Sequence, residues 1–146
     1  MGIPISKLGL SKEKKEMHYS VGALIEKNGK YLLIDRSNPP FGFAGPAGHV
    51  DEGETEIEAL VREVREESGL EVKGFKLLFE EYIEWNACKK GMQGHYWYLF
   101  GCETEGEVKK NDHEETSIGW YTREEIKKLK LEPVWEYWFR KLGIIP

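Results

Sequence analysis

The sequence has few cysteines, no long apolar run and no block of basic residues. Cys88 and Cys102 are its only cysteines, too few for a disulfide framework, and they do not form a Cys-x-x-Cys pair. No apolar stretch approaches the roughly 18 residues that a membrane span requires, and the N-terminus lacks a signal-peptide core. We therefore expect a reduced, cytoplasmic protein without a membrane partner.

The absence of a basic block also bears on the choice of ligand. The chain has 21 Lys and Arg against 26 Asp and Glu, a net charge of −5, and its one lysine-rich run, Lys12–Glu16, is short and mixed. This balance disfavours nucleic acid as a partner but allows a small anionic substrate bridged by a metal ion. We expect residues 1–17 to form an N-terminal arm or added strand and residues 18–146 to form one domain, either monomeric or homodimeric.

What the sequence does contain is an acidic helix that precedes a glycine. Thr55 and Glu58 have the spacing of a capping box, and Gly69 stands where a helix would end, so we predict a helix over residues 55–68. At about 100° per residue, four apolar residues share one face of this helix and are expected to be buried. They are Ile57, Leu60, Val61 and Val64.

A ridge of acidic side chains lies beside that apolar face. Glu63 and Glu67 share an arc with Glu56, and Glu66 lies further round. Carboxylates held ~5 Å apart repel by about 3 kcal/mol at an effective dielectric constant of ~20, and a bound divalent cation reverses this term. An all-oxygen set of ligands suits Mg²⁺ or Mn²⁺. The alternative is a solvated helix face whose glutamates pair with arginines.

The spacing of the whole segment from Gly48 to Leu70 resembles the signature box of the Nudix hydrolase family. The matching positions are Gly48, Glu54, Arg62-Glu63-Val64, Glu66-Glu67 and Gly69-Leu70. The resemblance implies an α+β fold, namely a Nudix-type α/β/α sandwich with a mixed β-sheet, and a Nudix hydrolase domain over residues 18–146. It also implies metal-dependent hydrolysis of a phosphoanhydride bond in a nucleoside diphosphate linked to another group.

The resemblance implies a role for each acidic position. Glu63, Glu66 and Glu67 would be the inner ligands of Mg²⁺, with Mn²⁺ as the alternative ion, and the main-chain oxygen of Gly48 would be another ligand. Either Glu66 or Glu67 would also orient or deprotonate the attacking water.

Two further residues lie within the box, and one of them, Arg62, is a candidate catalytic residue with an orienting role. Arg62 is expected to lie on a different side of the helix from Glu63 and to orient the site by pairing with Glu54. His49 is interpreted as a hydrogen-bonded spacer rather than as a ligand.

Residues outside the box are also candidates for the site. Arg36 ends an apolar run, and its guanidinium would fit substrate phosphate oxygens; a surface charge is the alternative interpretation. Family members often add an acid from outside the box, and Glu115, or alternatively Glu114, is our candidate. A solvated loop is the competing interpretation for these two residues.

The rest of the chain predicts strands joined by short turns and two terminal helices. Strands are expected over 18–26, 30–36, 77–85, 95–102 and about 117–121. Asn28-Gly29 indicates a hairpin, a loop is expected over 37–45, and a turn over 89–94. Helices are expected from Thr122 to about Lys130 and from Pro133 to Leu142.

The sequence says less about the substrate than about the type of reaction. Trp85 stands where the ADP-ribose group has a proline, and Cys88 stands where some diadenosine polyphosphate hydrolases have a tyrosine. The default is therefore a small nucleoside triphosphate-type pyrophosphohydrolase. The alternatives are a nucleotide-sugar or dinucleoside polyphosphate hydrolase and a nucleotide sensor with the same fold that no longer hydrolyses, although the box retains its glutamates.

Overall fold

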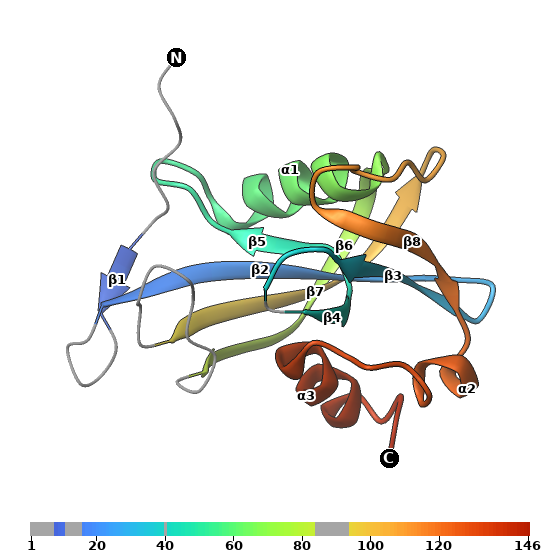
Figure 1. Ribbon diagram of the computed structural model, residues 1–146. Coiled ribbons are helices and arrows are strands. Elements are labelled where there is room, and N and C mark those ends of the chain that lie inside the picture. The colour runs from blue at the N-terminus through green and yellow to red at the C-terminus, as the bar shows by residue number, and fades with distance from the viewer. Residues whose placement is uncertain (1–7, 11–15, 40, 84–93) are drawn as a thin grey trace.

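A computed structural model describes residues 8–10, 16–39, 41–83 and 94–146 (Figure 1). The strands are β1 (Leu8–Leu10), β2 (Glu16–Lys27), β3 (Lys30–Arg36), β4 (Gly42–Ala44), β5 (Ala47–His49), β6 (Glu71–Ile83), β7 (His95–Glu105) and β8 (Glu115–Tyr121). The helices are α1 (Glu56–Ser68), α2 (Arg123–Ile126) and α3 (Pro133–Lys141).

The long strand β2 organises a mixed sheet. The main strand order is β4-β3-β2-β7-β6, with β1 and β5 also paired to β2, and β8 paired to β3. The β2–β7 pair is parallel, and all the other strand pairs among the described residues are antiparallel. Helix α1 covers one face of this sheet and α3 the other (Figure 1). The predicted α/β/α arrangement with a mixed sheet is therefore confirmed.

Alternation along the strands gives the sheet two apolar cores. In β7, Trp97 and Leu99 join the core beneath α3, whereas Phe100 and Cys102 join the core beneath α1. The α3 core also buries one apolar face of that helix, namely Val134, Trp135, Trp138 and Phe139. Strand β7 is thus covered on both faces.

Helix α1 has the predicted caps. Thr55 accepts a hydrogen bond from the Glu58 backbone N–H, Glu58 returns one to the Thr55 N–H, and Gly69 ends the helix at φ 77° in the left-handed region. Its buried arc is shifted toward the acidic ridge, because Leu60 and Val64 are buried whereas Ile57 and Val61 are only half-buried. The fully buried residues are Ala59, Leu60, Val64, Glu67 and Ser68.

Several predicted boundaries were wrong for identifiable reasons. Strand β6 begins at Glu71 rather than at residue 77, because the left-handed Gly69 turns the chain straight from the helix into the sheet. Strand β4 lies inside the expected loop over 37–45, where it pairs with β3. Helix α2 ends at Ile126, well before Lys130.

Trp85 and the expected turn over 89–94, except Gly94, lie outside the described residues. No helix in the described part of the chain has the length and hydropathy of a bilayer span.

The two-core arrangement predicts a clear difference between two phenylalanines. Phe100 is 3% exposed and Phe41 is 58% exposed. We expect Phe100→Ala to lower the free energy of unfolding by about 3–5 kcal/mol, because it leaves a cavity beneath α1. Phe41→Ala is the control and should change stability little. Urea denaturation followed by tryptophan fluorescence measures both, and equal stabilities would contradict this placement of β7.

Candidate active site

The site begins where α1 crosses the short strand β5. A Cβ atom placed on Gly48 would lie 2.2 Å from the carboxyl carbon of Glu63, a distance that no real contact allows. Only glycine therefore lets this carboxylate lie against the backbone of β5. The arrangement brings the Gly48 main chain and the Glu63 side chain together, as the box spacing had suggested.

A hydrogen bond fixes the second inward-facing carboxylate to the same strand. The backbone N–H of Ala47 donates to Glu67 Oε2 at 2.7 Å, and Glu67 is only 6% exposed. The next acid, Glu66, has an exposed side chain whose Oε2 lies 3.3 Å from an Arg62 nitrogen. The ridge therefore contains two enclosed carboxylates and one that faces solvent.

Burial shifts the ionisation of both enclosed acids. It raises the pKa of Glu63 to about 7, with further upward contributions from Glu66 and Glu114 and an opposing one from Arg62. Burial likewise raises the pKa of Glu67 well above its usual range, and repulsion from Glu63 adds to this effect. Ionising two adjacent buried carboxyls is costly, and a bound cation lowers this cost by neutralising their charge.

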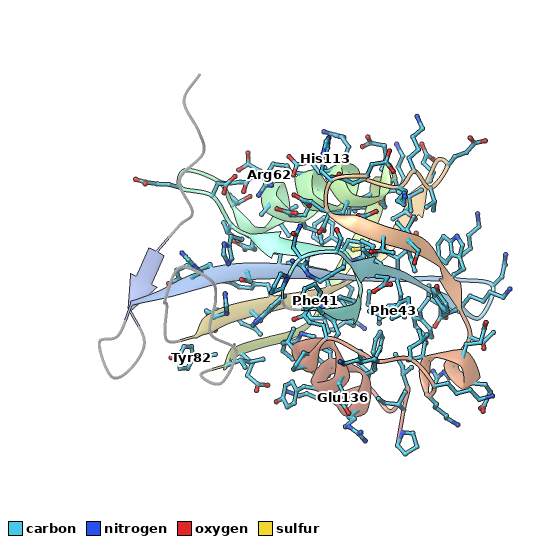
Figure 2. All side chains as sticks on the ribbon, in the orientation of Figure 1. Phe41, Phe43, Arg62, Tyr82, His113 and Glu136 are labelled. Atoms are coloured by element: carbon cyan, nitrogen blue, oxygen red, sulfur yellow. The ribbon has the colours of Figure 1, made fainter. Side chains whose placement is uncertain are left out.

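Arg62 links the helix to the loop before it. Its Nε donates to Glu54 Oε2 at 2.8 Å and its Nη2 to Glu54 Oε1 at 3.0 Å, as predicted. Arg62 also donates to the His49 carbonyl at 2.9 Å and lies 3.3 Å from Asp51. These bonds raise the pKa of Arg62 and lower that of Glu54. Figure 2 shows Arg62 on the α1 side of the molecule.

Arg62 also contacts Glu63, its neighbour in the sequence. Arg62 Nη1 donates to Glu63 Oε1 at 2.7 Å, although the two residues are expected on different sides of the helix. The long arginine side chain curls over the helix surface and reaches its sequence neighbour. One guanidinium therefore holds the loop and also contacts an acid of the ridge.

Acids from outside the box lie around Arg36. Glu115 is buried and is the register partner of Arg36 across β3 and β8. Glu115 Oε1 accepts a bond from the Asn111 N–H at 3.0 Å, whereas its buried Oε2 has no hydrogen-bond partner among the described residues. Burial raises the pKa of Glu115 to about 7. Glu114 is exposed, and its charge raises the pKa of both Glu63 and Glu67. Both candidate acids therefore lie near the site, Glu115 in the interior and Glu114 at the surface.

Sequence reasoning missed one buried acid in the same region. Glu132 precedes α3, is buried, and makes no capping hydrogen bond with its side chain. Burial raises its pKa to about 7, and the charge of Arg36 opposes this shift. In the sequence, the Glu132-Pro133 pair predicts only where a helix begins. It does not predict that Glu132 approaches Arg36, because this depends on how α3 packs beside β4.

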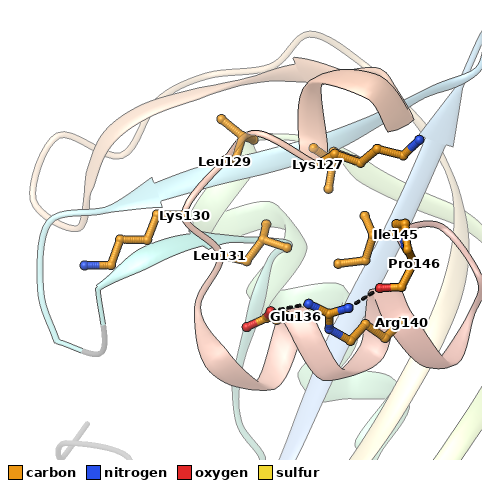
Figure 3. Close-up of a pocket in the computed structure, with 9 residues that line it drawn as sticks. Lys127, Leu129, Lys130, Leu131, Glu136, Arg140, Ile145 and Pro146 are labelled. Carbon is orange, nitrogen blue, oxygen red and sulfur yellow. Dashed lines mark hydrogen bonds and ion pairs between the residues drawn. The ribbon is translucent and has the colours of Figure 1, made fainter.

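A pocket elsewhere on the molecule does not contain the box. It lies between α2, α3 and the last residues of the chain, has a volume of about 570 Å³, and is lined by Lys127, Lys130, Glu136 and Arg140 among others (Figure 3). It is on the α3 side of the sheet, and none of the predicted site residues lines it.

Comparisons with known proteins agree with the box and the fold. A sequence model described as "NUDIX domain" matches residues 16–142. This chain belongs to the Nudix family. It is 33% identical over 132 residues to the protein named nucleoside triphosphatase NudI from Enterobacter sp. (strain 638), covering 84% of this chain and 94% of that protein.

A more similar relative matches over a shorter segment. The protein named ADP-ribose pyrophosphatase from Methanocaldococcus jannaschii is 47% identical over 78 residues, which cover 51% of this chain and 46% of that protein. The match thus spans about half the length of that relative. Among solved structures, the MutT protein of Methanosarcina mazei Go1 superposes with a TM-score of 0.71 at 25% identity, covering 90% of this chain and 94% of that one.

The Arg62 network predicts unequal roles for two arginines of one helix. Arg62→Ala should lower the free energy of unfolding by about 2–4 kcal/mol, because it leaves partly enclosed carboxylates without their donor. Arg65→Ala is the matched control, since Arg65 is exposed and pairs with Glu71 at the surface. We expect it to change stability little in chemical denaturation, and similar losses in the two variants would contradict the network.

Glu132 predicts a pH-dependent effect on stability. Its pKa of about 7 in the folded protein exceeds its usual value of 4.5, so its favourable contribution is complete below pH 4.5 and is lost as the pH rises through 7. The free energy of unfolding of Glu132→Gln minus that of the wild type should therefore increase by about 2–3 kcal/mol from pH 5 to pH 8. Denaturation at both pH values measures this gain, and a difference independent of pH would show that Glu132 ionises normally.

Proposed function

We propose that this protein is a Mg²⁺-dependent pyrophosphohydrolase, with Mn²⁺ as an alternative ion, that acts on small nucleoside triphosphates. The observation that carries the proposal is the pair of enclosed carboxylates, Glu63 and Glu67, held against the β5 backbone beside Gly48. A protein without a cation gains nothing from burying two neighbouring acids whose ionisation is disfavoured.

The donor atoms at this position fit a hard divalent cation. The Glu63, Glu66 and Glu67 carboxylates and the Gly48 main-chain oxygen offer only oxygen, which suits Mg²⁺ or Mn²⁺. When bound, the ion would neutralise phosphate charge and favour attack of water on phosphorus. Arg62 would hold Glu63 in place, because its guanidinium bridges that carboxylate to the loop through Glu54.

The remaining roles follow from exposure and charge. We assign orientation of the water to Glu66, because its carboxylate faces solvent whereas Glu67 is bound to the Ala47 N–H. Glu67 remains the alternative base. Arg36 would contact a substrate phosphate, and Glu115 would be the additional acid, since its Oε2 lacks a hydrogen-bond partner close to that arginine.

The substrate class is supported by a relative that aligns along nearly its whole length. The NudI match covers 94% of a protein named as a nucleoside triphosphatase. Hydrolysis of ADP-ribose is the second candidate, favoured by the 47% identity to the Methanocaldococcus protein over its shorter matching segment. Both reactions would cleave a phosphoanhydride with the same box.

Product analysis with a substrate panel tests the proposal. Purified protein with Mg²⁺ would be incubated with nucleoside triphosphates, oxidised nucleotides, ADP-ribose, other nucleoside diphosphate sugars and dinucleoside polyphosphates, and the products identified by mass spectrometry. We expect release of pyrophosphate from a triphosphate. Preferential cleavage of ADP-ribose would select the second candidate, and tight nucleotide binding without cleavage would identify a sensor.

Substitutions in the box test the residue assignments. Glu66→Gln and Glu67→Gln should each reduce turnover by about 10²-fold or more, because each removes a negative oxygen from the cation site or the base. Glu52→Gln is the matched control, since Glu52 is an exposed glutamate in the preceding turn. Circular dichroism would check that all three variants fold. Near-normal turnover in both box variants would remove the metal assignment.

A further inference from the structure

Three of the four histidines of the chain converge on one point of the sheet. His18 lies on β2, His49 on β5 and His95 on β7. Each offers a ring nitrogen, and these three atoms all lie within 4.8 Å of one another. Sequence spacing does not reveal this cluster, because its members stand far apart in the chain, at positions 18, 49 and 95.

Strand register explains the convergence. His18 and His95 are direct partners in the parallel β2–β7 pair, and His49 is the partner of Ser20, two residues along β2 from His18. Partners and residues two apart share a face of a sheet, so the three side chains stand on one face. This face carries Trp97 and the α3 core, whereas Gly48 faces Glu63 on the other side. The histidines and the box carboxylates thus lie on opposite faces of β5.

The geometry of the cluster is close to that of a metal site. His49 Nε2 and His95 Nε2 are 3.2 Å apart. Tetrahedral zinc with Zn–N bonds of about 2.0–2.1 Å places its nitrogen ligands about 3.4 Å apart, so this pair already has the required spacing. The His18 ring centroid is 4.2 Å from that of His49, and its ligand nitrogen lies within 4.8 Å of the other two.

We propose that His18, His49 and His95 bind one transition-metal ion of the zinc class, with water in the fourth position. Imidazole nitrogen suits Zn²⁺, Co²⁺, Ni²⁺ or Cu²⁺ and does not suit Mg²⁺, so this site and the carboxylate site select different ions. His18 is 1% and His95 5% exposed, which makes the site enclosed rather than a surface cluster. The competing interpretation is a hydrogen bond between His49 and His95 within a packed cluster.

The position of the site indicates a structural role. The ion would join β2, β5 and β7 at one point, and β5 is the three-residue strand that provides the Ala47 N–H to Glu67. The carbonyl of His49 itself accepts a hydrogen bond from Arg62. The bound ion would therefore hold β5 from the face opposite the box and stabilise the strand on which the carboxylates rest.

Cobalt binding tests this assignment directly. Protein freed of metal with a chelator would be titrated with Co²⁺ in the presence of saturating Mg²⁺, which occupies oxygen sites, and the visible absorption of nitrogen-ligated Co²⁺ would be recorded. We expect one equivalent of Co²⁺ to bind and Zn²⁺ to displace it. His95→Gln should weaken binding at least tenfold, whereas His113→Gln, which changes the exposed fourth histidine, should bind like the wild type.

Further variants separate this proposal from folding defects and from the proposed function. His49→Gln, at the half-buried member, should also lose Co²⁺, and thermal unfolding in chelator would check that both triad variants fold. Zn²⁺ should raise the melting temperature of the wild type, of His113→Gln and of Glu67→Gln, but not that of the two triad variants. Glu67→Gln should retain the Co²⁺ spectrum even though it loses hydrolysis. No stoichiometric Co²⁺ binding, or binding lost in Glu67→Gln but kept in His95→Gln, would overturn the proposal.

Discussion

The burial of two neighbouring carboxylates between α1 and β5 is the constraint on which the site depends. Glu63 requires a residue without a side chain at position 48, and Glu67 requires the Ala47 N–H. Arg62 supplies a positive charge, but it contacts only the first of these acids. Burial still raises the pKa of both acids, so ionising them together retains an electrostatic cost. This cost is what a divalent cation in the proposed site would offset.

Strand β5 connects the two carboxylates to the rest of the fold. It has only three residues, yet α1 contacts it on one face through Glu63 and the proposed histidine site lies on the other. Its pairing with β2 places it beside the strand that both cores share. A short strand has little pairing energy of its own, so side-chain contacts on both faces give it a defined position.

Local sequence signals predicted the parts of this protein whose energetics are local. The capping box at Thr55 and the Asn28-Gly29 hairpin depend on neighbouring residues, and both formed as expected. The start of β6 was missed because it pairs with the distant end of β7, and the short strand β4 was missed because Phe43 also bonds to Lys130 and Glu132. Likewise, the box spacing predicted the Arg62–Glu54 pair, whereas Glu132 and the histidine cluster arise from packing and register that no spacing reveals.

The charges around Arg36 suggest why metal and substrate should bind together. Glu67, Glu115 and Glu132 each interact electrostatically with this one arginine, so the metal-free site already has an excess of acid. A polyphosphate adds further negative charge and would be repelled unless a cation or protons neutralise the carboxyls. In the proposed function, Mg²⁺ and substrate must therefore each raise the affinity for the other by the same factor. In the same proposal, substrate selection would fall to the groups that β3, β8 and the start of α3 contribute around this arginine.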